Sequence, residues 1–305
     1  MLILEKMLVF LILMLVGLLL AKVRVLDEPS SRKLSAIVLY VANPALLIGS
    51  SQTEHNIPGA QLLTTLLIAL LMFAVLIATA AVLPRLFRLG REEGSAYALM
   101  AVFSNIGYLG IPLINEVLGS QAILYASVFI LVFNVLIYTY GVMILQRAIS
   151  QPAQHTASWR KLINPGVLSG IVAVVFYLLK IKLPDVINVP LGYLSNLTAP
   201  LSMLLIGAAL AQVSFLSFFS DWKLLIFSVL KLLVLPILLG FVLKLAIGGG
   251  DLLGVCIIMM SAPVGSMTVM MAQQYGGDYT LLSRGVTLTT VLCIATIPIV
   301  FAVLL

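Results

Sequence analysis

Ten stretches of mostly apolar residues follow one another along this chain, each about as long as a helix that crosses a bilayer. A hydrocarbon core about 30 Å thick requires about 20 helical residues. The chain is 62% hydrophobic and only 9% charged, with mean hydropathy +1.19, whereas soluble domains are about 25% charged. The stretches cover residues 4–22, 33–52, 60–83, 94–117, 121–147, 164–181, 192–212, 222–246, 251–274 and 281–304. The sequence therefore predicts an all-α polytopic membrane protein with ten transmembrane helices.

The basic residues predict the orientation of these helices. Glu5 and Lys6 leave the amino end of the first 22 residues without net positive charge, so we interpret residues 4–22 as a retained helix and not as a signal peptide. An external amino terminus places most Lys and Arg residues in cytoplasmic loops, as the positive-inside rule requires. We therefore expect a multi-pass protein of the inner (plasma) membrane, with both termini on the extracytoplasmic side. The net charge of +6 reflects this topology and does not indicate a nucleic-acid partner.

The two halves of the chain carry similar motifs. "YVANPALLIGS" in the second stretch is matched by "NLTAPLSMLLIGAAL" in the seventh, each with a proline shortly before LLIG. The longest polar connection, "AISQPAQHTASWRK", lies between the fifth and sixth stretches. We therefore predict a first five-helix repeat at 1–150, a cytoplasmic linker at 151–163 and a second repeat at 164–305. Because five is odd, the second repeat must be inverted relative to the first.

The fourth and ninth stretches hold helix-breaking residues at matching positions. These are "SNIGYLGIP" at 104–112 and "SAPVGSMT" at 261–268. Gly and Pro also serve ordinary kinks and close packing in membrane helices. Interrupted segments at matching positions of two inverted repeats, however, indicate a transport site near the middle of the bilayer.

The expected breaks favour an anionic ligand. Pro112 and Pro263 each lack an N–H group and clash with the carbonyl four residues earlier. Backbone groups freed in this way must lie inside protein or beside a wet cavity. A helix that restarts there directs its N–H groups and the positive end of its dipole toward the cavity, which suits a carboxylate.

The motifs "NPALLIGS", "SNIGYLGIPL", "NPGVLSGI" and "SAPVGSMTVMMAQQYGGD" resemble the auxin efflux carrier family in its bacterial branch, to which malonate and malate permeases are ascribed. The resemblance covers essentially the whole chain. It implies a scaffold part, a transport part, broken helices that cross at the substrate site, and an elevator-like movement. It also implies a superfamily shared with sodium-coupled bile-acid symporters, and it makes a homodimer plausible.

The resemblance assigns a carboxylate-facing amide to Asn105, near Pro112, and the matching place in the ninth helix to Pro263 with Ser266 and Thr268. Plant members carry an asparagine beside the second proline, where this chain has Ala262 and Val264. Aromatic auxin is therefore in doubt as the substrate. The predicted substrate-binding residues are Asn43, Asn105, Gly107, Gly110, Ile111, Pro112, Asn134, Pro263, Val264, Gly265, Ser266 and Thr268.

Energy coupling is left open by the sequence. No Asp or Glu lies in the middle of a predicted helix, and proton relays usually need such a group. We expect no cofactor. Coupling to Na⁺, as in bile-acid-type symporters, is an alternative to transport driven by the membrane potential alone. Lys231 is the one obvious charge deep in a stretch, and it can either stabilise carbonyls freed near Pro236 or attract the substrate.

An intramembrane enzyme and an anion channel are the two alternatives to a transporter. An intramembrane enzyme needs paired acids, a nucleophile beside a base, or a metal motif. The sequence has no HExxH motif or P-loop, and both histidines, His55 and His155, fall in loops. An anion channel remains an alternative, since paired broken helices also occur in channels. We predict a secondary transporter of a small organic anion that works by alternating access, and no enzyme.

Overall fold

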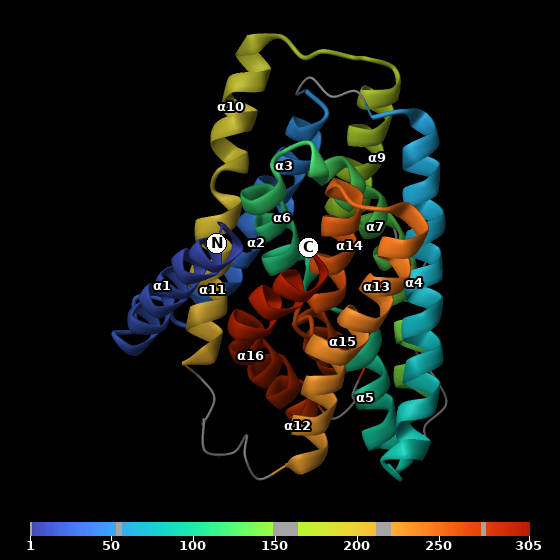
Figure 1. Cartoon of the computed structure of the whole chain (residues 1–305). Coiled ribbons are helices and arrows are strands. Elements are labelled where there is room, and N and C mark those ends of the chain that lie inside the picture. Colours follow the sequence, from blue (N-terminus) through green and yellow to red (C-terminus); the bar gives the residue numbers. More distant parts are fainter. Residues whose placement is uncertain (1, 53–56, 149–163, 212–220, 276–278) are drawn as a thin grey trace.

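The computed structural model describes residues 2–52, 57–148, 164–211, 221–275 and 279–305, and these residues form helices without any strand (Figure 1). The predicted linker at 151–163, with His155, and the loop residue His55 lie outside these ranges. The α-helices are α1 (Leu2–Lys22), α2 (Glu28–Ile37), α3 (Asn43–Ser50), α4 (Gly59–Leu86), α5 (Arg91–Val102), α6 (Ile111–Leu118), α7 (Ala122–Leu136), α8 (Val142–Ala148), α9 (Pro165–Leu178), α10 (Asp185–Ser195), α11 (Thr198–Leu210), α12 (Trp222–Val229), α13 (Leu235–Ile247), α14 (Asp251–Ser261), α15 (Met267–Tyr275) and α16 (Thr280–Leu304).

Seven helical stretches among the described residues are long and apolar enough to cross a membrane. They are Ile3–Lys22, Glu28–Ser50, Gly59–Leu86, Ala122–Arg147, Asp185–Leu210, Trp222–Ile247 and Thr280–Leu304. The other three predicted spans correspond to the shorter apolar helices Ile106–Leu118, Pro165–Leu178 and Asp251–Ser261. The chain is thus an all-α, multi-pass membrane protein by length and composition, and the count of ten spans stays a prediction.

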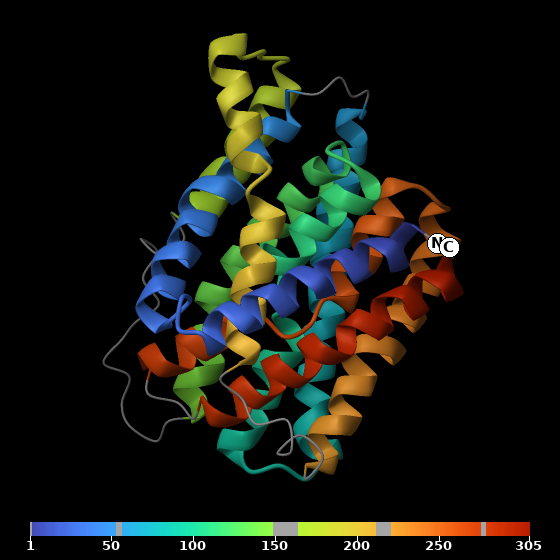
Figure 2. The same ribbon diagram turned by 90° about the vertical axis from the view of Figure 1, so that its left-hand side faces the viewer.

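The helices form two packed groups, and each group takes helices from both parts of the sequence. The group that we call the wall contains α1 to α3 and α9 to α11. In it, α1 packs along α11, α2 contacts α11, and α3 packs on α9 and α10. Figure 2 looks onto the side formed by α1, α10 and α11. The second group, which we call the core, contains α4 to α8 and α12 to α16, with α4 against α5 and α7, and α14 against α13 and α16. The wall meets the core where α9 packs on α7 and α11 packs on α6. The inverted repeat stays a prediction.

Glycines allow the backbones of α1 and α11 to touch. A Cβ atom built on Gly17 would lie 2.1 Å from the Leu204 carbonyl oxygen, and one on Gly207 would lie 1.9 Å from the Met14 carbonyl oxygen. Small residues bring membrane helices together in this way because lipid gives little hydrophobic drive for their association. The wall is therefore held by close van der Waals contact between main chains.

Three helices contain a π-helical turn immediately before a proline. The turns are η1 (Val38–Ala42) before Asn43-Pro44, η2 (Ile106–Gly110) before Ile111-Pro112, and η6 (Leu230–Val234) before Leu235-Pro236. In each case the residue before the proline donates its N–H to the carbonyl five residues earlier. Proline cannot donate a hydrogen bond and its ring crowds the preceding turn. A widened turn makes room for it without ending the helix.

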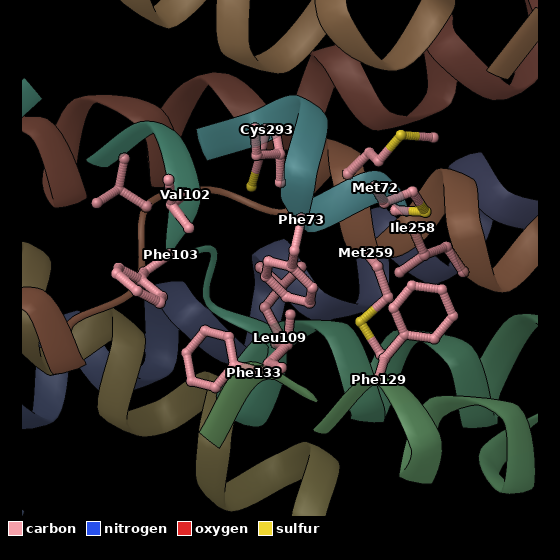
Figure 3. Packing of buried hydrophobic residues seen from close by; sticks show 14 of the residues in the cluster. Met72, Phe73, Val102, Phe103, Leu109, Phe129, Phe133, Ile258, Met259 and Cys293 are labelled. Atoms are coloured by element: carbon pink, nitrogen blue, oxygen red, sulfur yellow. The ribbon is translucent and has the colours of Figure 1, made fainter. Parts of the chain in front are cut away.

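Aromatic and sulfur-containing side chains fill the centre of the core group (Figure 3). The rings of Phe103 and Phe133 meet edge to face with centroids 5.6 Å apart, a geometry that adds stability beyond burial. Buried hydroxyls in this region donate to their own helices, as Ser127 does to the Ile123 carbonyl and Ser228 to the Leu224 carbonyl. These hydroxyls thus have partners in an apolar interior, as buried polar groups generally require.

Candidate functional site

Two interrupted helices lie side by side in the core group. α5 ends at Val102 and η2 begins at Ile106, while α14 ends at Ser261 and α15 begins at Met267. The two non-helical segments form an antiparallel β-bridge between Ser104 and Val264. The Asn105 N–H donates to the Pro263 carbonyl at 2.7 Å, and the Gly265 N–H donates to the Phe103 carbonyl at 2.9 Å. We call Phe103–Asn105 the first interruption and Ala262–Ser266 the second.

The pairing satisfies backbone groups that would otherwise be unpaired inside a membrane. Beyond these two bonds, the Val264 N–H donates to the Thr289 hydroxyl of α16 at 3.0 Å. Gly265 permits the close approach, because a Cβ atom there would lie 2.9 Å from the Ser104 carbonyl oxygen. Non-helical backbone is tolerated at membrane depth only where protein or a wet cavity supplies partners of this kind.

A cavity of about 470 Å³ lies beside the paired interruptions, between the wall and the core. This volume suits a small molecule. The described residues that line it are uncharged: Leu39, Tyr40, Asn43, Leu47, Ser104, Asn105, Ile106, Gly107, Tyr108, Ile111, Ile130, Phe133, Asn134, Tyr138, Asn164, Pro165, Gly166, Gly265, Ser266, Met267, Met270 and Met271. Nor do the described residues include a group of His, Cys, Asp or Glu that could hold a metal ion.

Three helices begin beside this cavity. Asn105 caps η2, which continues into α6, by accepting from the Tyr108 N–H at 3.3 Å, and Asn164 caps α9 by accepting from the Val167 N–H at 3.1 Å. The third helix, α15, begins at Met267. The first N–H groups of a helix have no partner within it, and each helix start carries about half a positive charge. These helix starts direct partial positive charge toward a cavity whose described lining side chains are neutral.

Main-chain donors remain free at two of these helix starts. Among the hydrogen bonds of the described residues, none is donated by the backbone N–H of Gly107, Ser266 or Met267. All three residues line the cavity. An anion placed between the two interruptions could accept from these N–H groups, as phosphates and carboxylates do at helix starts.

The wall group contributes amides to the same cavity. Asn43 donates to the Gly107 carbonyl at 3.2 Å, while its own carbonyl oxygen is buried without a hydrogen-bond partner. Asn134 of α7 accepts from the Asn164 amide at 2.9 Å and donates to the Ile130 carbonyl. The Tyr108 hydroxyl is paired with Ser35 of α2. Contacts from both groups thus converge on one space.

The structure brings together seven of the twelve predicted site residues at the cavity: Asn43, Asn105, Gly107, Ile111, Asn134, Gly265 and Ser266. The other five lie elsewhere. Pro263 and Val264 pair with the first interruption, and Thr268 donates to the Gly265 carbonyl. Gly110 packs near Ile106 and Met259. Pro112 lies inside the helix that η2 begins, seven residues beyond Asn105. The first interruption is therefore earlier in the chain than the proline from which it was expected.

Some cavity residues were not predicted from the sequence. Asn164 is the clearest, and a signal for it exists, because an asparagine before a proline that opens an apolar helix is a typical N-cap. Tyr108 and the methionines Met267, Met270 and Met271 carry no comparable signal. From the sequence alone, an apolar residue in a membrane helix is equally compatible with a position that faces lipid, protein or a cavity.

Comparison with known proteins identifies the chain at the level of the family. The sequence profile described as "Membrane transport protein" matches residues 2–158 and 153–301. The chain belongs to this family. It is the auxin efflux carrier family, so the resemblance drawn from the four motifs is confirmed.

Two relatives within the curated proteins support the assignment to transporters. One is an uncharacterized transporter of Methanocaldococcus jannaschii, 26% identical over 295 residues, which cover 94% of each chain. The other is an uncharacterized transporter of Methanothermobacter thermautotrophicus, 26% identical over 297 residues, which cover 97% of this chain and 96% of the relative. A membrane transport function is consistent with all of these matches.

Proposed function

We propose that the protein is a secondary transporter of a small organic anion, with a carboxylate bound in the cavity beside the two interruptions. The observation that carries the proposal is the convergence of three helix starts on one uncharged cavity. Neutral amides and helix dipoles bind an anion without a basic side chain that would hold it too tightly for release. The neutral lining does not favour a cationic substrate.

Alternating access requires that the cavity open to one side of the membrane at a time. The cavity lies at the junction of the wall and the core, with Asn43 and Asn164 from the wall and Asn105 and Ser266 from the core. Movement of one group against the other would expose the anion to either side while both interruptions travel together. We propose an elevator-like movement of the core for this reason.

The membrane potential alone is a sufficient driving force for export. Moving one negative charge out of a cell that is negative inside releases about 2.3 kcal/mol at 100 mV. This corresponds to a concentration ratio of about fifty. We therefore propose export across the plasma membrane, with both termini outside, without a coupled proton.

Counterflow in liposomes tests the proposal directly. The purified full-length protein is reconstituted, and uptake of radiolabelled acetate, malonate and malate is measured against an excess of the same unlabelled anion inside. A transporter gives saturable counterflow that exceeds that of empty liposomes, and its net efflux into medium without the anion responds to a potential imposed with K⁺ and valinomycin. Saturable net efflux that ignored the potential would contradict potential-driven export.

A matched pair of variants locates the site. Asn105→Leu removes an amide that lines the cavity, while Asn196→Leu changes an exposed asparagine at the end of α10. We expect the first variant to lose counterflow and the second to retain it. Equal loss in both would exclude the cavity as the specific site, and conductance without saturation would indicate a channel.

A further inference from the structure

Lys231 contacts the first interruption but does not line the cavity. Its side chain extends from η6 and is 2% exposed. The ammonium group donates to the Ala101 carbonyl at 3.2 Å and to the Ser104 hydroxyl at 2.9 Å. Ala101 belongs to the last turn of α5, and Ser104 forms the bridge to the second interruption. A single side chain thus contacts both the end of a helix and the non-helical segment.

The partners of Lys231 are neutral oxygens. None of the ion pairs among the described residues involves Lys231. The last carbonyls of a helix carry partial negative charge and favour a cation. In transporters built on interrupted helices, unwound carbonyls and helix ends of this kind coordinate the coupling Na⁺. The oxygens around the Lys231 ammonium therefore have the chemistry of an alkali-metal site.

We propose that the ammonium group of Lys231 is a tethered cation that occupies the position of a coupling ion at the paired interruptions. The role of Lys231 in transport rests on the proposed function of the protein as an anion transporter. The protein's own lysine supplies the positive charge that Na⁺ would otherwise bring, so substrate binding and transport do not require Na⁺. Removing the side chain exposes the Ala101 carbonyl and the Ser104 hydroxyl as ligands for a free ion.

A space adjoins Lys231 and Ala101. A crevice of about 440 Å³ lies between α4 and the α12–η6 segment, and both Ala101 and Lys231 line it. Its other described lining residues are apolar apart from Thr79. Shortening Lys231 to alanine extends this crevice to the two oxygens, whereas methionine fills nearly the same volume without a charge.

Thermal stability of the purified protein tests the proposal without any substrate. Cys256 and Cys293 are free and buried, so a thiol-reactive fluorescent dye reports their exposure on unfolding. Tm is measured in NaCl and in choline chloride of equal concentration. The wild type is expected to give the same Tm in both. Lys231→Ala should unfold several degrees lower in choline chloride and gain about 3 °C in NaCl near ten times its Kd for Na⁺.

Two controls separate ion binding from a general effect of salt. Lys231→Met keeps the space filled, and Lys231→Ala combined with Ser104→Ala removes one of the oxygen ligands. Neither should respond to Na⁺. If Lys231→Ala does not fold, Lys231→Asn replaces it, since its amide oxygen adds a third neutral ligand. A Na⁺-specific rise of Tm in the wild type would overturn the proposal, as would the absence of a response in the alanine or asparagine variant.

Counterflow then connects the ion to transport. With radiolabelled malonate or malate as the probe, wild-type flux should be equal in Na⁺ and choline, while Lys231→Ala should regain flux only in Na⁺. If the wild type transports none of the tested anions, the proposed function fails while the comparison of Tm values still decides the role of Lys231. Wild-type flux that stopped in choline would overturn the tethered-cation proposal alone.

Discussion

The two interruptions pair with each other, yet their side chains are of opposite character. The first interruption carries Ser104 and Asn105, which contact Lys231 and cap η2. The second carries Ala262, Pro263 and Val264, and its central N–H depends on Thr289 of a neighbouring helix. One segment thus offers polar side chains to its surroundings, whereas the other offers mainly backbone.

From this difference we expect the first interruption to determine binding of the anion and the second to determine the stability of the pair. Side chains of the first interruption reach the cavity, whereas the second contributes Gly265 and the free N–H group of Ser266, next to that of Met267 at the start of α15. A substitution in the first segment should therefore change the affinity for the anion. A substitution in the second should act on the stability of the pair. Each variant below is compared in both respects, as the free energy of unfolding and as KM in counterflow.

Gly265→Ala should have the largest effect on stability. The added methyl group would lie 2.9 Å from the Ser104 carbonyl oxygen, and backbone on both sides prevents an easy shift. We expect a loss of about 3 kcal/mol, the upper end for overpacking, measured by thermal or denaturant unfolding in detergent. Gly249→Ala is the control, because no atom lies within 4 Å of its added Cβ. Equal stability of the two variants would refute the close pairing.

Thr289→Val should destabilise the second interruption without altering recognition. It keeps the shape of the side chain but leaves the buried Val264 N–H without an acceptor, at a cost of about 1–3 kcal/mol. KM should stay unchanged, because Thr289 does not line the cavity. Thr290→Val is the matched control, since that hydroxyl bonds only the carbonyl of Val286 in its own helix. A raised KM in Thr289→Val would show that the segments are not separable.

Asn105→Ala should reverse this pattern. Loss of the N-cap costs about 1 kcal/mol, so the protein remains folded. The missing amide, however, removes a group that lines the cavity, and loss of a hydrogen bond to a charged ligand lowers binding by about tenfold to a hundredfold. Counterflow at a fixed low anion concentration measures the loss. A folded variant with normal KM would remove Asn105 from the site.

The sequence predicted the fold class because apolar stretches of bilayer length are hard to misread. The resemblance to the family also predicted that the segments around Asn105 and Pro263 lie together, since it implies that the two broken helices cross. The division into wall and core was less accessible, because it depends on which faces of similar apolar helices meet. Gly17 and Gly207 mark one such contact, but a glycine alone does not name its partner.

The position of the first interruption shows where local rules were insufficient. Proline chemistry suggested that Pro112 opens the helix, whereas η2 absorbs this proline and the helix is interrupted at Phe103–Asn105. The same π-helical solution precedes Pro44 and Pro236. A proline in a membrane helix therefore has two outcomes, and only the tertiary contacts of Asn105 with Pro263 select the site of the break.

Pro112→Ala tests this distinction and should have the smallest effect of the four. The register of η2 is held by the Asn105 carbonyl, which accepts from both Leu109 and Gly110, and by Asn43, which donates to the Gly107 carbonyl. These contacts do not involve Pro112, so we expect KM within threefold of the wild type. Pro112 is buried, and the loss of its packed ring atoms is offset by the helix donor that alanine restores, so stability should change by about 1 kcal/mol or less. Pro44→Ala, after η1, is the parallel variant. If Pro112→Ala raised KM as much as Asn105→Ala, the proline would set the register of the first interruption, and the two interruptions would both depend on proline after all.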